Sequence, residues 1–365
     1  MRRWAGVARF GGIGDNLIAA SVFAPLKRMG YLVDVITGEP NHVIYHHNPH
    51  VDKLSVKKVE RDLPQNDLPG WQKWLDSRAC EYDVFLHASH SCEGRHAVFP
   101  TMTAFWWPAD YRRKLCAGSY LETVHDIIGV PHEFGPLYFT SPEERARAQQ
   151  VKDRVGGRFV AWIISGTRVD KVYPYMAFAI SRVIKELGVA VVMIGGSNAK
   201  EFGMAKTIQD QINIQNSTDD RLHLALSPET AEPGGDQSWP IRRSLALAQA
   251  ADLVVTPDTG AAWAVAFEPV PKVVMLSHAS PENITKHWVN TTTLHADPDR
   301  VPCWPCHRLH DSIATCVENK QKNGAACISD ISVETLVAAV ADGLQCKSNN
   351  IVHAEHAFPR GKSYG

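Results

Sequence analysis

The sequence predicts an α/β protein of two domains, each built on a parallel β-sheet. Short apolar runs alternate with helical patterns over most of the chain, which is the order of β-α-β units. The apolar runs are continuous, as in strands that are buried on both faces of a sheet. A chain of 365 residues is also long for a single compact core. We therefore expect a first domain over residues 1–150, a second over 151–335, and a helix with a polar tail over 336–365.

The composition argues against several classes of function. Lysine and arginine number 38 against 39 for aspartate and glutamate, so no net positive field attracts nucleic acid. No apolar run approaches the roughly 20 residues that span a bilayer. Glycines and Asp15 interrupt the stretch after Arg2 and Arg3 before a signal-peptide core forms. We expect a cytoplasmic protein with no nucleic-acid partner and no integral membrane segment.

The first half of the chain has the pattern of strands and helices joined by one long loop. We expect strands at residues 7–10, 32–37 and 84–87, and helices at 15–29 and 71–79. Residues 92–118 combine prolines with several aromatic side chains and predict an irregular loop. Aromatic side chains in such a loop either pack on a core or stack on a sugar.

A polar helix links this half to the next. Residues 142–155 follow Ser141 as a cap and have proline in the first turn. We expect the second half to have strands at 158–165, 189–196, 221–226, 252–257 and 272–276, and helices at 175–187, after 198, at 241–251 and from about 261. Ligands of parallel sheets bind beyond the carboxyl ends of the strands. The crevice between two such domains is therefore the expected site.

The first candidate site is the glycine cluster "GGIGD" between a strand and a helix. Gly12 and Gly14 fit the start of a dinucleotide fingerprint, but Leu17 occupies the place of its third glycine, so the cluster indicates NAD only weakly. Asp15 has two interpretations. It caps the helix, or it is a carboxylate kept ionised by the helix dipole and able to accept a proton.

Two further strand ends have the residues of a phosphate site. Thr167 and Lys171 follow one strand in "ISGTRVDKVYP" and could grip a phosphate; a solvated lysine in a connecting loop is the alternative. Asp258, Thr259 and Gly260 follow another strand and lead into a helix of small residues. Free backbone N–H groups there would cradle a diphosphate, unless Asp258 is simply a helix cap.

A group of cysteines predicts a metal site. Cys303 and Cys306 form a C-x2-C pair, and Cys316 and Cys327 follow within 25 residues. Four thiolates with this spacing match a closed tetrahedral site for zinc or iron. Full coordination makes the site structural, and reduced cysteines without a metal are the alternative. The other four cysteines are scattered.

Taken together, these motifs resemble the family-nine glycosyltransferases, the bacterial heptosyltransferases of lipopolysaccharide assembly. The resemblance lies in the order of "GGIGDNLIAASVFAPLK", "SGTRVDKVYP", "MIGGSNAKE" and "ADLVVTPDTGAAWAVA" along the chain. It implies a GT-B fold, in which an acceptor-side Rossmann-like domain faces a second one that binds the nucleotide-sugar. It also implies inverting transfer of a sugar, heptose in this family, without a catalytic metal.

The resemblance also assigns roles to residues. Asp15 matches the general base and Lys171 the lysine on the donor phosphate. The other donor-binding positions are Gly14, Thr167, Asp258, Thr259, Gly260 and, as the ribose-binding acid, Glu201. The expected donor is ADP-heptose, and the expected acceptor is a hydroxyl of a glycan or a protein.

Two departures from the family concern specificity and the cysteines. Trp263 stands where the family has a histidine, which removes a polar donor. The cysteine segment 301–328 is similar to the iron-bearing finger of heptosyltransferases that modify autotransporter proteins. Two other functions remain open at this point: a nucleotide-sugar 2-epimerase, and a catalytically silent scaffold with the same fold.

Overall fold

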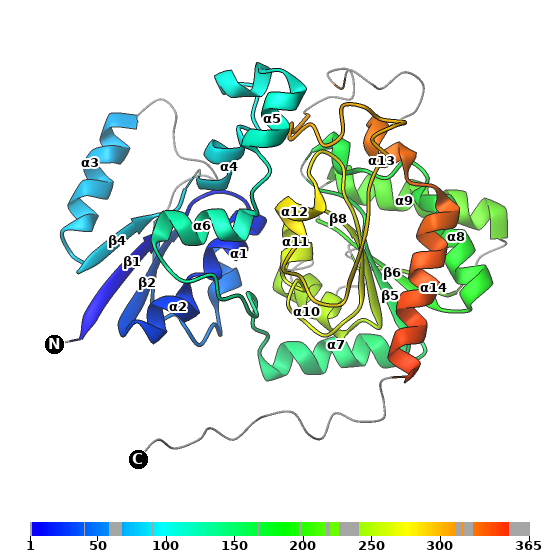
Figure 1. The fold of residues 1–365 in the computed structure, drawn as a ribbon. Coiled ribbons are helices and arrows are strands. Elements are labelled where there is room, and N and C mark those ends of the chain that lie inside the picture. Colours follow the sequence, from blue (N-terminus) through cyan, green and yellow to red (C-terminus); the bar gives the residue numbers. More distant parts are fainter. Residues whose placement is uncertain are drawn as a thin grey trace, which may run out of the picture.

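The computed structural model has two parallel β-sheets side by side, each with helices packed against it (Figure 1). It describes residues 2–39, 41–57, 68–89, 91–166, 168–196, 199–216, 220–225, 241–310, 316 and 324–349. The first sheet has the strand order β3-β2-β1-β4 and the second β10-β9-β8-β5-β6-β7. The sequence therefore predicts the fold class correctly, as an α/β protein with two parallel sheets.

The first sheet is formed by the first 87 residues. Its strands are β1 (Arg3–Ala8), β2 (Tyr31–Gly38), β3 (Lys53–Lys57) and β4 (Val84–His87). Its helical elements are α1 (Ile13–Ala20), α2 (Phe23–Arg28), η1 (Asn41–Tyr45) and α3 (Leu68–Ala79). All strand pairs are parallel, and β1 lies between β2 and β4. The carboxyl end of β1, where the glycine cluster begins, is thus flanked on both sides.

The helix expected over residues 15–29 is two helices. Pro25 has no N–H to donate to the carbonyl of Ser21 four residues earlier, so the helical hydrogen bonding cannot continue through this point. Ser21 instead donates its hydroxyl to the carbonyl of Ile18, at 2.6 Å. The break separates α1 from α2 and leaves α1 as a short helix.

The loop expected over residues 92–118 is largely helical, which corrects the sequence prediction. The elements here are α4 (Ser91–His96), η3 (Thr103–Trp106) and α5 (Ala109–Leu115), followed by α6 (Tyr120–Ile128). Arg112 organises them from a fully buried position. It donates to the carbonyls of Ala97 and Ala104, and to those of Cys306 and His307. One side chain thereby joins this segment to the cysteine segment of the second half.

The second sheet is larger and follows the bridging helix. Its strands are β5 (Phe159–Ile163), β6 (Ala190–Ile194), β7 (Leu222–Leu224), β8 (Leu253–Pro257), β9 (Lys272–Met275) and β10 (Thr291–Leu294). Its helical elements are α7 (Pro142–Arg154), η4 (Val169–Lys171), α8 (Met176–Leu187), α9 (Ala199–Asn216), α10 (Ile241–Ala250), α11 (Gly260–Trp263), α12 (Pro281–Ile284), α13 (Ala326–Asp330) and α14 (Val333–Asn349). The Ser141 hydroxyl caps α7, as the sequence predicts, by accepting the N–H of Glu144.

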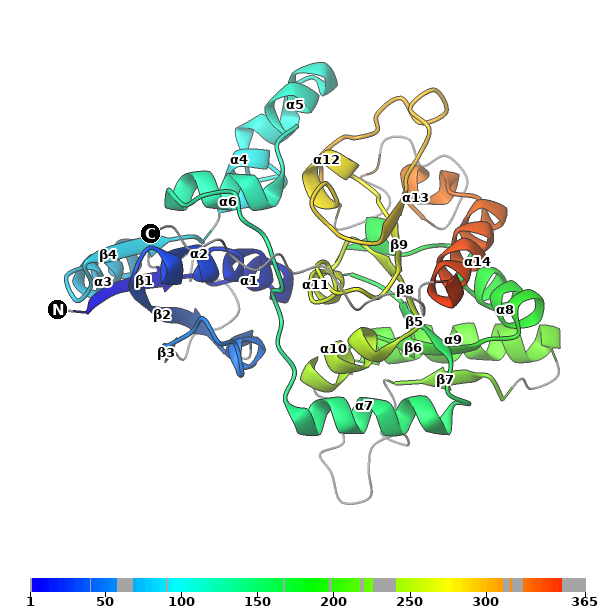
Figure 2. The same ribbon diagram turned by 60° about the horizontal axis from the view of Figure 1, so that its bottom comes forward.

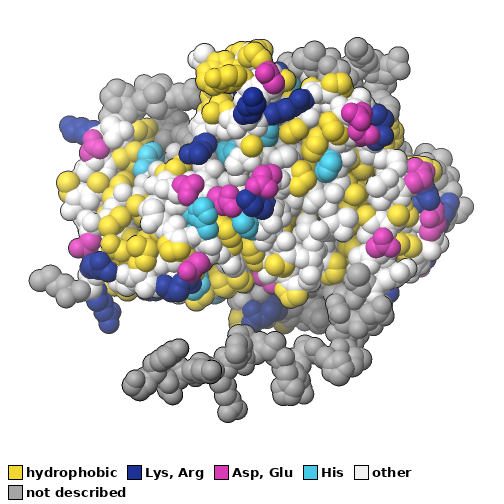
Figure 3. Space-filling model, in the orientation of Figure 1, with side chains coloured by type: hydrophobic (Ala, Val, Ile, Leu, Met, Phe, Trp, Pro, Cys, Tyr) yellow, Lys and Arg dark blue, Asp and Glu magenta, His cyan; other side chains and the backbone are white. Residues whose placement is uncertain are grey.

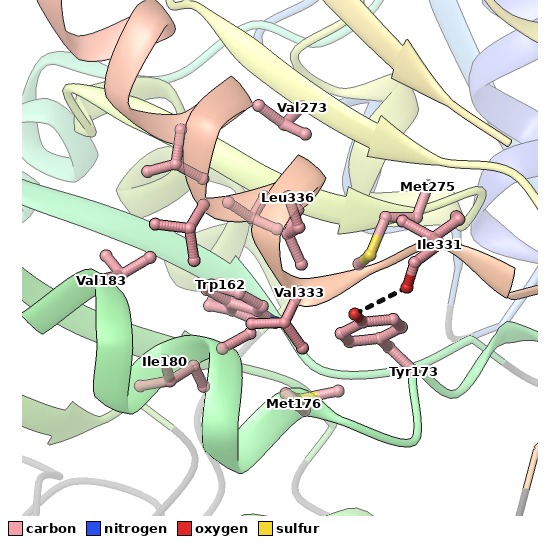
Figure 4. Close-up of a cluster of buried hydrophobic side chains, with 14 of the residues drawn as sticks. Trp162, Tyr173, Met176, Ile180, Val183, Val273, Met275, Ile331, Val333 and Leu336 are labelled. Atoms are coloured by element: carbon pink, nitrogen blue, oxygen red, sulfur yellow. Dashed lines mark hydrogen bonds between the residues drawn. The ribbon is translucent and has the colours of Figure 1, made fainter. Parts of the chain in front are cut away.

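A buried cluster holds the last helix to the second sheet (Figure 4). Trp162 of β5 and Val273 of β9 meet Leu336 of α14 in this cluster, and all three are almost completely buried. The Tyr173 hydroxyl donates to the carbonyl of Ile331 at 2.9 Å, which satisfies the one polar atom of that ring. α14 therefore packs against the second sheet.

A second cluster crosses from one sheet to the other. It contains Val7 and Leu17 from the first half and Trp263, Leu276 and Trp288 from the second. The two halves thus share buried apolar surface. In both ribbon views, α1 of the first half and α11 of the second lie next to each other (Figure 2).

Arg242 of α10 provides a polar link between the halves. Its guanidinium pairs with Glu144 of α7 at 2.6 Å and donates to the carbonyls of Val43 and His46 in the first half. Only 9% of the Arg242 residue is exposed. A buried charge with this many acceptors holds its partners in one arrangement.

The surface carries charges of both signs, interspersed over the face in Figure 3. Apolar side chains gather at the top of this face, where α5 lies in Figure 1. Trp106 is 69% exposed and Tyr111 is 63% exposed, whereas the neighbouring Phe105 is buried. Among the described residues, none of the helices has both the length and the apolar character that a membrane span requires.

Candidate functional site

Asp15 lies at the start of α1, directly beyond the carboxyl end of β1. Its Oδ2 accepts the backbone N–H of Gly12 at 2.8 Å, which is the reciprocal half of a capping box. Gly11 has a φ of +123°, and a Cβ there would lie 3.0 Å from Asp15 Oδ2. Because 34% of the Asp15 side chain is exposed, the capping contact leaves one side of the carboxylate accessible. The two interpretations of Asp15 are therefore compatible.

The loop that begins at Asp258, after β8, meets the glycine cluster through two glycines. A Cβ on Gly260 would lie 2.8 Å from the amide nitrogen of Gly14 and 3.0 Å from Cβ of Ile13. A Cβ on Gly14 would in turn lie 3.1 Å from Cα of Gly260. Thr259, with an extended backbone, is the N-cap of α11 and precedes this contact. The two strand ends that the sequence singles out, after β1 and β8, thus face each other.

Lys171 and Asp258 form an ion pair at the same place. Lys171 Nζ lies 3.1 Å from Asp258 Oδ2, and both side chains are largely buried. The Lys171 stem passes over Gly166, where a Cβ would be only 2.8 Å from its Cδ. The alternative of a solvated lysine in a connecting loop does not fit this buried pair. Thr259 is the N-cap of α11, and the carboxylate of Asp258 instead holds this ammonium.

Asp170, next to Lys171, is a site residue that the sequence does not single out. It is fully buried, accepts the Ser277 hydroxyl at 3.0 Å and lies 3.2 Å from Nδ1 of His278. The N–H of His310 donates to its second oxygen. Burial acts to raise the pKa of Asp170, but the hydrogen bond and charge of His278 hold it well below its usual value. These contacts fix the turn that carries Lys171.

Of the remaining predicted donor-binding residues, the structure describes Glu201. Glu201, in the first turn of α9, accepts the N–H of Gly196 just beyond the carboxyl end of β6. Its carboxylate is therefore at the edge of the sheet where the sequence predicts a ribose contact. Thr167 lies outside the described residues. Trp263 is buried and packs edge-on against Trp288, with ring centroids 4.8 Å apart, so this position contributes to the core.

The four cysteines of the predicted metal site line one small cavity. Its volume is about 30 Å³, and Cys303, Cys306, Cys316 and Cys327 all contribute to its wall, together with Asp170 and His278. Burial raises the pKa of the Cys306 thiol to about 12, and it raises that of Cys327 well above the usual value. Within the described parts of the chain, no three His, Cys, Asp or Glu side chains are gathered into a set of metal ligands. The structure thus brings the four thiols to one cavity without forming a metal centre.

Several solved structures with a similar fold are glycosyltransferases. The E. coli ADP-heptose lipopolysaccharide heptosyltransferase II matches over 94% of this chain and 99% of its own, with a TM-score of 0.61 and 13% identity. The glycosyl transferase family 9 structure from Veillonella parvula DSM 2008 covers 94% and 98%, with a TM-score of 0.60 and 16% identity. The chain has the fold of these enzymes.

A third similar structure contains iron. TibC from enterotoxigenic E. coli H10407, an iron-containing dodecameric glycosyltransferase, matches over 94% of this chain and 77% of its own, with a TM-score of 0.53 and 11% identity. No family model matches the sequence, and no curated protein does. At these identities the comparisons establish the fold, and the function must be argued from the site.

Proposed function

We propose that the protein is an inverting glycosyltransferase that moves a sugar from a nucleotide-diphosphate donor to a hydroxyl group. The observation that carries the proposal is the contact between the two glycine loops. Through Gly14 and Gly260, the accessible carboxylate of Asp15 is held beside the loop that begins at Asp258. A base held beside a diphosphate site suits a direct displacement at an anomeric carbon.

In the proposed reaction, Asp15 accepts the proton of the acceptor hydroxyl while its oxygen attacks the anomeric carbon. The bond to the donor diphosphate breaks on the opposite face, and the configuration inverts. Lys171 and the backbone N–H groups after Asp258 stabilise the negative charge that develops on the leaving diphosphate. Asp258 holds the Lys171 ammonium in place over Gly166 until the diphosphate replaces it as the partner.

ADP-heptose is the first donor to test, since the similar solved structures include an ADP-heptose heptosyltransferase. Purified protein is incubated with ADP-heptose and with other ADP- and UDP-sugars, with and without a cell-envelope extract. Nucleotide diphosphate released only when extract is present supports transfer to a glycan or protein hydroxyl. Turnover of the donor without any acceptor would instead favour the 2-epimerase. Calorimetric titrations with ADP and UDP in which neither nucleotide binds would favour the scaffold.

We also propose that the four-cysteine cavity holds a structural zinc or iron ion. Four thiols are a donor set that both metals accept, and their enclosure in one cavity supports the assignment. A bound cation would supply the positive charge that buried thiolates need, and it would tie the cysteine segment to the second sheet. Because four protein ligands leave no open position, we assign the ion no part in the transfer.

Elemental analysis of the purified protein tests this site. We expect about one equivalent of zinc or iron, and its loss in Cys303→Ser together with a lower Tm. Cys80→Ser is the matched control, because Cys80 is exposed and lies outside the cavity. Metal content below a tenth of an equivalent in protein purified under reducing conditions would contradict the proposal.

A further inference from the structure

Arg9 lies between the first sheet and Asp15, and its side chain is only 2% exposed. It follows β1 directly, and its backbone N–H donates to the carbonyl of Ile36 in β2 at 2.9 Å. Its Nη1 donates to the carbonyl of Ala88, just beyond β4, at 2.7 Å. The backbone of Arg9 is therefore held to β2 and its guanidinium to the segment just beyond β4, which leaves the side chain little freedom to move.

The second terminal nitrogen of Arg9 reaches the proposed base. Arg9 Nη2 lies 3.1 Å from Asp15 Oδ1, while Asp15 Oδ2 accepts the N–H of Gly12. Each carboxylate oxygen thus has a fixed donor from the protein. The Asp15 side chain is 34% exposed, and a substrate hydroxyl would approach the carboxylate from this exposed side.

Among the described residues, Tyr45 is a titratable group next to the pair. Tyr45 of η1 interacts electrostatically with Arg9 and with Asp15, and burial raises the pKa of its phenol far above the usual value, so it stays neutral. The Tyr45 hydroxyl donates to the backbone carbonyl of Asn16. The α11 segment that packs against α1 is Gly-Ala-Ala-Trp and has no ionisable side chain. His87, at the end of β4, is exposed to solvent.

We propose that Arg9 is the positioning residue for Asp15: it orients the carboxylate toward the acceptor hydroxyl and keeps it ionised at and below neutral pH. This inference rests on the proposed function. A fixed cation 3.1 Å away favours the carboxylate over the acid. It also prevents rotation of the carboxylate, which would cost rate because a reacting group displaced by about 1 Å loses on the order of a hundredfold.

The test compares pH profiles of kcat/KM for the wild type, Arg9→Met and Arg9→Lys. The acid limb of such a profile reports the essential base of the free enzyme. In Arg9→Met we expect this limb to move up by about one pH unit or more. We expect kcat near neutral pH to fall at least about tenfold, with part of the loss recovered at higher pH. The KM for the donor should stay within about twofold, because Lys171 and the Asp258 loop, which would hold the diphosphate, lie on the other half.

Arg9→Lys retains the charge but loses the planar, two-nitrogen contact. Its acid limb should stay close to that of the wild type while kcat falls, and this variant also serves if Arg9→Met does not fold. Arg3→Met is the matched control, since it removes the same charge from the exposed start of β1. Its profile should equal that of the wild type.

The outcomes separate this inference from the proposed function. If the wild type transfers sugar and both Arg9 variants lose activity equally at every pH, the role of Arg9 is structural and the inference is wrong. A kcat of Arg9→Lys equal to that of the wild type would refute the orienting role. If the wild type transfers no sugar from any donor, the proposed function itself fails, and with it the inference.

Discussion

Replacing Gly260 with alanine should push the two halves of the molecule apart. The added Cβ would lie 2.8 Å from the amide nitrogen of Gly14 and 3.0 Å from Cβ of Ile13. Non-bonded carbon contacts are normally about 3.5–4.0 Å. The loops must therefore separate by about 1 Å. Neither neighbour can yield easily, because one is backbone and the other is the Cβ of a branched side chain in the first turn of α1.

The expected cost follows from this overlap. Inserting one methyl group into a tightly packed contact costs about 1–3 kcal/mol. At about 2–4 °C per kcal/mol, a value for chains somewhat smaller than this one, Tm should fall by roughly 2–12 °C. The same displacement moves Asp15 away from the donor loop, so transfer should fall by on the order of a hundredfold.

Differential scanning calorimetry and the sugar-transfer assay measure the two effects. Gly203→Ala is the matched control, because Gly203 lies in α9 with no heavy atom within 4 Å of a built Cβ. Alanine there should raise stability by about 0.5–1 kcal/mol and leave transfer unchanged. If Gly260→Ala has the Tm and the rate of the wild type, the two glycine loops are not in contact and the reasoning fails.

Three further predictions concern the base, the lysine and the link between the halves. Asp15→Asn should reduce transfer at least about a hundredfold while calorimetry finds the donor Kd within twofold; a folded, active variant would remove Asp15 from the base role. Gly166→Ala would place Cβ 2.8 Å from Cδ of Lys171 and should weaken ADP binding as Lys171→Ala does; undiminished binding in both would contradict the phosphate assignment. Arg242→Met leaves Glu144 without its partner and should lower the urea unfolding free energy by about 3 kcal/mol. Burial acts to raise the pKa of Glu144, but the hydrogen bond from Arg242 holds it below 4.5, so the pair stabilises the fold above that pH. The unfolding free energy of the wild type should therefore fall on acidification below about pH 4.5, and that of Arg242→Met should fall less.

The fold class could be predicted from the sequence because strands that are buried on both faces of a parallel sheet have continuous apolar sequences. β5, β6 and β8 are buried at every position, and each lies within a strand expected from the sequence. β3 and β10 were not predicted, since these edge strands have the mixed burial of loops. The helical segment around α5 depends on Arg112, whose partners lie as far as 195 residues away. The sequence pattern of neighbouring residues cannot predict a contact between residues so far apart in the chain.

The candidate site was predicted in part, for a similar reason. The carboxyl ends of parallel strands lie on one edge of a sheet, so the sequence could predict that the glycine cluster and the Asp258 loop lie near each other, and Gly14 does pack against Gly260. Arg9 and Asp170 act through atoms of distant segments, Ala88 in one case and Ser277 in the other. These contacts depend on the burial and geometry of the folded chain, which the identity of one residue in the sequence does not reveal.

The buried cluster that crosses between the sheets also bears on how this molecule comes apart. Leu17 and Trp263 become exposed to solvent if the two halves separate. Exposing apolar surface costs about 25 cal/mol of free energy per square ångström. We therefore expect that neither half folds stably without the other. Melting should occur as one cooperative event, and a fragment that ends at the bridging helix should be poorly soluble by itself.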